Sequence, residues 1–225
     1  MSKSKNNYVG FKGGQTILPK LMSHVPDSKR YFSFFFGSGG LELSQSFNDT
    51  SWIIAEKDQA LRLKASTMDH VVYNDYQDIV ANFDFTSDDF VFCDPPYLLN
   101  TRKSGRKYYK NEFNLEDHKK FLNIIKNCKA KVMITHPFCD LYDSFLTDWY
   151  KIDFTYMSQS GWFEDGIYLN YLSCSVALKS YKYLGCDRTE RQMIKRKREN
   201  FCKKFESLSY HEKLAFLKQI NCRFI

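Results

Sequence analysis

The fold is decided by an apolar run that ends in a carboxylate and two prolines, Phe90-Val91-Phe92-Cys93-Asp94-Pro95-Pro96-Tyr97. Four consecutive apolar residues before Asp94 predict a strand that is buried on both faces of a sheet. The prolines cannot donate to a strand ladder, so the strand must end at this point. Open α/β sheets bind their ligands at the carboxyl ends of the strands, so we expect Asp94 and Tyr97 to border the ligand crevice.

The composition predicts a globular chain with one basic end. The 225 residues are 43% hydrophobic and 26% charged, with a formal net charge of +7. Residues 186–225 carry 11 Lys and Arg against 5 Asp and Glu, whereas residues 1–185 carry 22 against 21. A basic C-terminal segment predicts a polyanionic partner, and a solvated basic helix is the alternative interpretation.

Cysteine and histidine usage argues against disulfides and metal sites. The seven cysteines form no Cys-x-x-Cys pair, and the five histidines show no metal-ligand spacing. The expectation is therefore a reducing, cytoplasmic location without a bound metal. The sequence starts without an apolar signal region and has no run of membrane-spanning length, so no membrane partner is expected.

Three further strands are expected to end at the same edge as Asp94, each in residues suited to a nucleotide-like ligand. The turn Gly37-Ser38-Gly39-Gly40 follows the first, Glu56 the second and Asp75 the third. The turn is not a G-x-G-x-x-G fingerprint, which disfavours NAD, and an acid after the second strand suits ribose hydroxyls. Near the N-terminus, glycines surround Lys12, whose charge could meet a carboxylate or a phosphate. The three strands are expected at 31–36, 52–55 and 71–75.

The remaining elements follow from apolar periodicity and capping signals. Asn114 is the expected N-cap of a helix that buries His118 on its apolar face. A basic helix at 190–205 should bury Ile194, Phe201, Phe205 and Leu208, and a Ser209-x-x-Glu212 box should open a last helix with Leu214, Leu217 and Ile220 inward. Helices are also expected at 17–24, 41–47, 59–68 and 141–149, strands at 132–135, 152–157 and 174–179, and a loop or hairpin at 160–171.

The segment Asp94-Pro95-Pro96-Tyr97 suits activation of an exocyclic amine. The lone pair of adenine N6 is delocalised into the ring, so the nitrogen needs hydrogen-bond acceptors that draw it towards tetrahedral geometry. The Asp94 carboxylate and the Pro95 carbonyl can accept both N–H groups, and Tyr97 can stack on the base. Cys93 lies on the strand before the segment, so no nucleophilic cysteine is available for C5 chemistry.

In this order the motifs resemble those of the D12-class, Dam-like N6-adenine DNA methyltransferases, especially the short phage and prophage members. The resemblance implies an α/β, Rossmann-like class I methyltransferase sheet with helices on both faces and a basic helical extension, as domains 1–183 and 184–225. It implies S-adenosylmethionine as cofactor, a flipped-out adenine in double-stranded DNA as substrate, and a homodimer or a restriction-modification partner.

The resemblance also implies roles for individual residues. The catalytic residues would be Asp94, Pro95, Pro96 and Tyr97. The cofactor would be held by Tyr8, Lys12, Phe36, Gly37, Gly39, Glu56, Asp75 and Asp94. Nucleic acid would contact Arg102, Lys103, Arg106 and Lys107 in the basic loop 98–113, and Lys195, Arg196, Lys197 and Arg198 in the tail.

Only 18 residues separate Asp75 from Asp94, whereas Dam-like enzymes place a target-recognition domain in this interval. Base recognition is therefore expected from residues 98–113, from the C-terminal helices or from a partner. Three alternatives stay open: N6-adenine methylation of RNA, N4-cytosine methylation, and DNA binding without catalysis.

Overall fold

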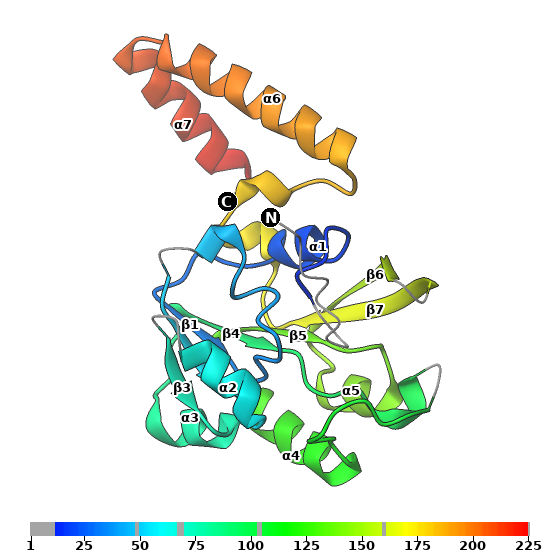
Figure 1. Cartoon of the computed structure of the whole chain (residues 1–225). Coiled ribbons are helices and arrows are strands. Elements are labelled where there is room, and N and C mark those ends of the chain that lie inside the picture. Colours follow the sequence, from blue (N-terminus) through cyan, green and yellow to red (C-terminus); the bar gives the residue numbers. More distant parts are fainter. Residues whose placement is uncertain (1–11, 48–49, 67–69, 103–104, 159–160, 225) are drawn as a thin grey trace. The chain divides into compact units, whose positions relative to one another are not determined.

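The computed structural model describes residues 12–47, 50–66, 70–102, 105–158 and 161–224 (Figure 1). The chain divides into two compact units, Met1–Ser180 and Tyr181–Ile225. The predicted functional boundary between residues 183 and 184 stays a prediction. None of the helices in the described ranges is long and apolar enough to cross a membrane.

Within the described residues of the first unit, seven strands form one mixed sheet in the order β3-β2-β1-β4-β5-β7-β6. Strands β1 to β5 are parallel, and β7 is antiparallel to both of its neighbours. The strand order reverses between β1 and β4, which makes their carboxyl ends the topological switch point of the sheet. The predicted Rossmann-like α/β sheet is confirmed. The strands are β1 (Arg30–Ser33), β2 (Trp52–Ala55), β3 (Val71–Tyr73), β4 (Asp89–Cys93), β5 (Lys131–Thr135), β6 (Tyr150–Ser158) and β7 (Gly161–Leu169).

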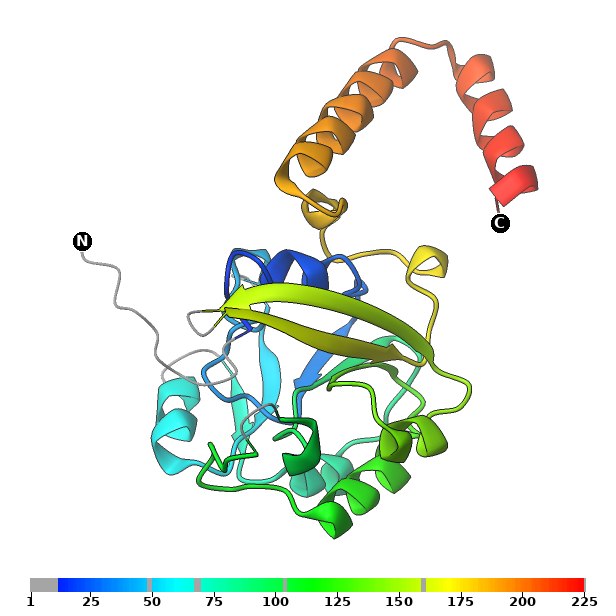
Figure 2. The same ribbon diagram turned by 90° about the vertical axis from the view of Figure 1, so that its right-hand side faces the viewer.

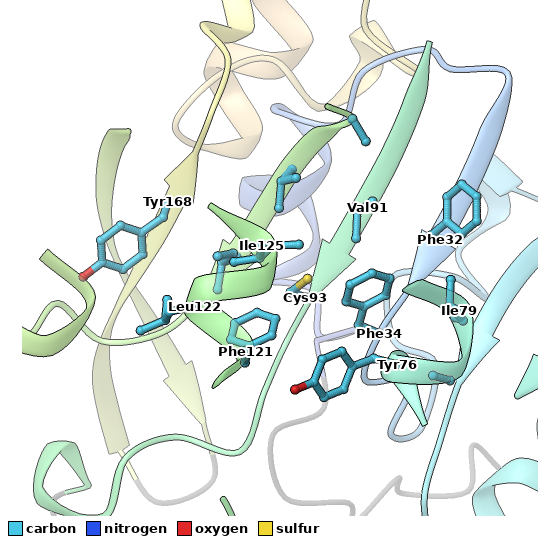
Figure 3. Packing of buried hydrophobic residues seen from close by; sticks show 14 of the residues in the cluster. Phe32, Phe34, Tyr76, Ile79, Val91, Cys93, Phe121, Leu122, Ile125 and Tyr168 are labelled. Atoms are coloured by element: carbon cyan, nitrogen blue, oxygen red, sulfur yellow. The ribbon is translucent and has the colours of Figure 1, made fainter. Parts of the chain in front are cut away.

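One face of the sheet is covered by helices α3 and α4, whose apolar residues pack on the central strands. Figure 3 shows Tyr76 of α3 and Phe121 of α4 beside Phe34, which follows β1, and Val91 of β4. Every residue of β4 is buried, as predicted for a central parallel strand. The helices of the first unit are α1 (Leu18–Met22), α2 (Gln59–Ser66), α3 (Tyr76–Asn82), α4 (Leu115–Ile125) and α5 (Asp140–Phe145).

The opposite face carries an aromatic cluster formed by alternate strand residues. The Tyr31 ring lies 5.2 Å from Phe47 in the short 3₁₀ helix η1 (Gln45–Phe47), and Trp52 of β2 lies 4.9 Å from the same ring. Phe90 of β4 completes the cluster, 6.1 Å from Tyr31. Successive strand residues point to opposite faces of the sheet. Strands β1 and β4 therefore contribute buried side chains to the apolar core on each face, which holds these strands in place.

Two local predictions about helix starts are confirmed. The Asn114 side chain accepts a hydrogen bond from Asp117 N at 3.0 Å, and α4 begins at the next residue. His118 on this helix is fully buried, as expected. In the second unit, Ser209 and Glu212 form the predicted capping box, with Ser209 N donating to Glu212 at 2.8 Å.

The strand predicted at 174–179 is wrong. The stretch at 160–171, predicted as a loop or hairpin, contains β7, which forms an antiparallel hairpin with β6, and no strand forms at 174–179. Ser173–Ser175 is a 3₁₀ helix, and Leu178 makes an isolated bridge with Pro26. The reason is tertiary: β7 pairs with β6 along its whole length and with β5 at its end, so Ile167, Tyr168 and Leu169 are buried between these two strands.

Two other elements differ from prediction. Residues 41–47 form turns and the three-residue η1 instead of a helix. The short interval between Asp75 and Asp94 contains helix α3, where the sequence led us to expect no element. This helix connects β3 to β4 and buries Tyr76 and Ile79, so the interval serves the sheet itself.

The second unit contains the consecutive helices α6 (Arg188–Glu206) and α7 (Tyr210–Phe224) (Figure 2). Their predicted apolar stripe is largely exposed, which corrects the expectation of a buried face. Ile194, Phe205 and Leu208 are half-buried, and the exposed residues are Phe201, Leu214, Leu217 and Ile220. Two helices without a further layer cannot enclose an apolar stripe, because burial of such a stripe needs another element packed against it.

Candidate active site

A cavity of about 290 Å³ lies at the carboxyl ends of the parallel strands. Gly37 after β1, Glu56 after β2 and Asp75 at the end of the β3 segment lie on its wall, together with Asp94 and Pro96 after β4. The sequence predicted this convergence, because the carboxyl ends of parallel strands share one edge of the sheet. Four strand ends therefore build a single site.

The glycine turn after β1 has a backbone that favours glycine. Gly37 and Gly39 have φ angles of 54° and 72°, in the left-handed region. Gly37 N donates a hydrogen bond to Glu56 Oε2 at 2.7 Å, which ties the turn to the end of β2. A Cβ atom on Gly40 would lie 2.3 Å from Gly13 N, so this glycine lets the N-terminal segment approach the turn closely.

Two other residues predicted to hold a cofactor, Phe36 and Gly39, are not part of the cavity wall. Phe36 is 3% exposed, and its ring would lie 2.5 Å from a Cβ atom on Gly39. Neither residue lines the cavity, and their mutual packing supports the shape of the turn. Tyr8 lies outside the described residues.

The carboxylates of Glu56 and Asp75 are fixed before any ligand binds. Glu56 accepts hydrogen bonds from the N–H groups of Gly37 and Asp58, the second at 2.8 Å, and burial raises its pKa. Asp75 caps α3 by accepting from Gln77 N at 3.1 Å and pairs with Lys57 at 2.6 Å. Each carboxylate still has lone pairs available towards the cavity.

Asp94 lies where the cavity meets the interior, and its side-chain contacts are made through one carboxylate oxygen, Oδ1. Thr135 Oγ1 donates to Asp94 Oδ1 at 2.6 Å, and Lys12 Nζ lies 3.3 Å from the same oxygen. Among the described residues no hydrogen bond to Oδ2 is found, so this oxygen is presented for an incoming donor. Burial raises the pKa of Asp94 to about 6, although the Lys12 charge opposes the shift.

Lys12 is a buried cation held by three acceptors. Its Nζ pairs with Asp94 and with Asp165 Oδ2 on β7 at 3.1 Å, and it donates to the Tyr97 hydroxyl. Burial opposes the charge of Lys12, but the two carboxylates outweigh it and raise the pKa of this amine. Lys12 is therefore charged and contacts Asp94, and it is not among the residues that line the cavity.

Tyr97 is anchored at both ends. Its hydroxyl donates to Asp165 Oδ2 at 2.6 Å, and its backbone oxygen accepts from Arg102 Nη2 at 2.5 Å. The next residue is also held, because Leu98 N donates to His136 Nε2 at 3.1 Å. Burial lowers the pKa of His136 to about 3, so this ring is a neutral structural acceptor.

The chain matches the model of the D12 class N6 adenine-specific DNA methyltransferases over residues 45–161, just over half of its length. The chain belongs to this family. The methyltransferase thus has the class I fold that its strand order indicates. None of the curated proteins compared with the chain matches it.

Solved structures resemble the methyltransferase only distantly. An rRNA methylase from Streptococcus thermophilus is 14% identical, covers 68% of this chain and 97% of its own, and has a TM-score of 0.43. A methyltransferase from Pyrococcus furiosus is 15% identical, with coverages of 68% and 80% and a TM-score of 0.43. A Streptococcus mutans protein in complex with SAH is 12% identical, with coverages of 67% and 94% and a TM-score of 0.38.

The basic loop of the methyltransferase is partly buried. The Arg102 side chain is 5% exposed and binds both oxygens of Glu112, at 2.8 and 2.5 Å. Glu112 also accepts from the N–H groups of Tyr108 and Tyr109, and both tyrosines line the cavity. Arg102 and Glu112 thus fold the loop into the cavity wall beside Tyr97.

The other residues predicted to bind nucleic acid are exposed or lie outside the described ranges. Arg106 and Lys107 are exposed on the loop, and Lys103 is not described. Lys195 to Arg198 are exposed on α6 of the second unit, where Lys195 lies 3.8 Å from Glu199. Their side chains are therefore accessible to a polyanion.

Sequence reasoning missed Asp165, Thr135 and the Arg102–Glu112 pair. A signal existed for Asp165: Phe163, Asp165 and Ile167 lie at the two-residue period of one strand face, and the central member of this otherwise apolar set is charged. A carboxylate at an inward strand position needs a buried partner. Because the stretch was interpreted as a loop or hairpin, this signal was not used.

Proposed function

We propose that the methyltransferase transfers a methyl group from S-adenosylmethionine to N6 of an adenine flipped out of double-stranded DNA. The observation that carries the proposal is the one-sided Asp94 carboxylate, which has Oδ1 held by Thr135 and Lys12 and Oδ2 open. An acceptor fixed in this way suits an amine that must be held and deprotonated as it is methylated.

The cavity residues fit the proposed cofactor. Glu56 and Asp75 offer fixed carboxylates to ribose hydroxyls or to a positive charge, and Gly37 allows close approach of a ligand to the backbone. Tyr108 and Tyr109 add aromatic surface to the wall. When bound, S-adenosylmethionine supplies a methyl group on a positively charged sulfur.

The residues of the Asp94 to Tyr97 segment would hold the adenine. Asp94 Oδ2 and the Pro95 carbonyl accept the two N6–H groups, and the Tyr97 ring stacks on the base. The C–N6 bond would form as the methyl C–S bond of the donor breaks and S-adenosylhomocysteine leaves. N6 would then pass one proton to Asp94 Oδ2, from which it would be released to water. The adjacent Lys12 charge keeps Asp94 ionised at neutral pH despite its burial.

The basic residues support a polyanionic substrate. Arg106, Lys107 and the four residues from Lys195 to Arg198 are exposed and can contact backbone phosphates. These contacts would position the duplex without reading its sequence. A restriction partner, a second copy of the chain and a phage origin stay predictions.

The test uses purified protein, tritiated S-adenosylmethionine and unmethylated duplex DNA, with RNA of matched sequence in parallel. N6-methyladenine in the DNA is the expected product, identified by nucleoside chromatography. Label that appears only in RNA, or N4-methylcytosine as the product, would overturn the proposed substrate. DNA binding without transfer to either polymer would identify a protein that binds DNA without catalysis.

A further inference from the structure

Strand β7, which lies between β5 and the edge strand β6, carries a buried carboxylate that none of the assigned roles uses. Asp165 has a side chain that is 1% exposed, and it is followed by the fully buried run from Gly166 to Leu169. A buried carboxylate is costly unless it is paired and hydrogen-bonded. Its partners therefore indicate what it does.

All three partners of Asp165 are defined by geometry. Oδ2 accepts from the Tyr97 hydroxyl at 2.6 Å and from Lys12 Nζ at 3.1 Å, while Oδ1 accepts from Gly166 N at 3.0 Å. The backbone contact fixes the orientation of the carboxylate. One oxygen thus holds the far end of the tyrosine ring and the cation that holds Asp94.

We propose that Asp165 is a positioning residue for methyl transfer, which fixes the Tyr97 ring and, through Lys12, the rotation of the Asp94 carboxylate. The proposal rests on the proposed function, because it assigns Tyr97 and Asp94 to the target base. Asp165 itself does not line the cavity and is not expected to touch the cofactor.

The geometry explains why a second carboxylate is needed. With Asp94 alone, the Lys12 ammonium would be free to rotate about its one ionic partner, and the Tyr97 hydroxyl would lack its 2.6 Å acceptor. With Asp165, the ammonium has three acceptors for its three N–H groups. Lys12 then holds Asp94 Oδ1 in place, which leaves Oδ2 aimed at the substrate.

The charge of Asp165 also affects the ionisation of Asp94. Burial is the main cause that raises the pKa of Asp94, Lys12 lowers it, and Asp165 raises it again. Loss of the Asp165 charge should therefore lower the pKa of Asp94 and move the acid limb of the rate profile to lower pH. The titratable groups around Asp94 are Lys12, Glu42, Cys93, Tyr97, Tyr109, Tyr142, Tyr156 and Asp165.

The kinetic test compares Asp165→Asn with Asp153→Asn, a matched variant on the exposed side of the neighbouring strand β6. Asp165→Asn keeps the side-chain shape and should lower kcat by up to about 100-fold, because a misplaced reacting group can cost that much. Its acid limb should move to lower pH while cofactor affinity, measured by calorimetry, stays within about twofold of wild type. Asp153→Asn should match wild type in all three quantities.

A double-mutant cycle with Tyr97→Phe shows whether Asp165 acts through Tyr97. Both variants remove the same hydrogen bond, so their effects on kcat should not add. The kcat of the double variant should lie within about twofold of the kcat of the slower single variant. The proposal would be overturned if the two substitutions lowered kcat independently, so that their effects multiplied in the double variant. It would also be overturned if Asp165→Asn had the kcat and pH profile of wild type. Parallel loss of cofactor binding and folding would also overturn it, since it would assign Asp165 to structure alone.

An NMR readout does not depend on any methylation assay. In ¹⁵N-lysine-labelled protein, the Lys12 ammonium should give a protected signal that Asp165→Asn removes and Asp153→Asn keeps. If wild-type protein modifies only RNA, the proposed DNA substrate fails, and the kinetic comparison is made on RNA. If the Lys12 signal survives in Asp165→Asn, the positioning role fails whatever the substrate.

Discussion

The carboxyl edge of the sheet and the C-terminal helices both carry charges with a proposed function, but they hold them in opposite ways. At the sheet edge, Lys12 and Asp165 have side chains that are 5% and 1% exposed, and each charge has several partners. On α6 no residue is buried, and Lys195 has an ion pair of 3.8 Å with Glu199. Reaction chemistry needs fixed, desolvated groups, whereas contact with phosphates needs only accessible charge.

The sharpest test of this comparison removes the carboxylate at the reaction centre. Asp94→Ala should lower the transfer rate by at least about 100- to 1,000-fold, because it removes a preorganised polar group. Cofactor binding should partly survive, because Glu56, Asp75 and Gly37 remain on the cavity wall. Filter-binding transfer assays and calorimetry measure the two effects. A variant that retains activity would remove Asp94 from its proposed role.

Two arginines of the basic loop test whether the loss of stability on substitution to Ala depends on burial of the side chain or on its charge alone. Arg102→Ala should destabilise the protein by about 1–3 kcal/mol, because the half-buried Glu112 carboxylate loses both guanidinium hydrogen bonds and keeps only the N–H groups of Tyr108 and Tyr109. Arg106→Ala, at an exposed position, should change stability by less than about 0.5 kcal/mol. Chemical denaturation compares the two. Equal effects on stability would show that the loop is not held by the Arg102–Glu112 pair.

The pH dependence of the transfer rate tests whether the ionisation of Asp94 depends on the charge of Lys12. Because burial raises the pKa of Asp94 to about 6 and transfer needs the ionised form, the rate should fall about tenfold between pH 7 and pH 5. Lys12→Met should move this limb to higher pH, since the lysine charge lowers the pKa of Asp94. A profile that does not change between pH 5 and 7 would contradict the assigned role of the carboxylate.

The C-terminal unit should show the smallest and most salt-dependent effect. Replacing Lys195 to Arg198 with Ala should weaken DNA binding several-fold and reduce the slope of log affinity against log salt. The rate at saturating DNA should not change. A charge-conserving control exchanges Lys and Arg at the same four positions and should keep the slope. An unchanged slope in the Ala variant would mean that this helix face is only solvated.

Local signals in the sequence predicted most of the parallel part of the sheet. The apolar runs before Glu56 and Asp94 form β2 and β4, and Asn114 caps α4, because each signal acts within a few residues. The strand predicted at 174–179 was wrong because the segment that pairs with β6, its neighbour in sequence, and with β5, which is distant in sequence, is 161–169. The prediction of a buried apolar stripe on the last two helices was wrong because no element among the described residues of their unit covers it.

The sequence by itself determined which groups reach the carboxyl edge, since strand ends and turn residues are encoded locally. Gly37, Glu56, Asp75, Asp94 and Pro96 all line the cavity, where the order of motifs predicts them. Only the tertiary structure decided how Asp94 is held, because Lys12, Thr135 and Asp165 come from three distant segments. The physical reason is that hydrogen bonds and ion pairs act over a few ångströms in space, and separation along the chain does not reveal that distance.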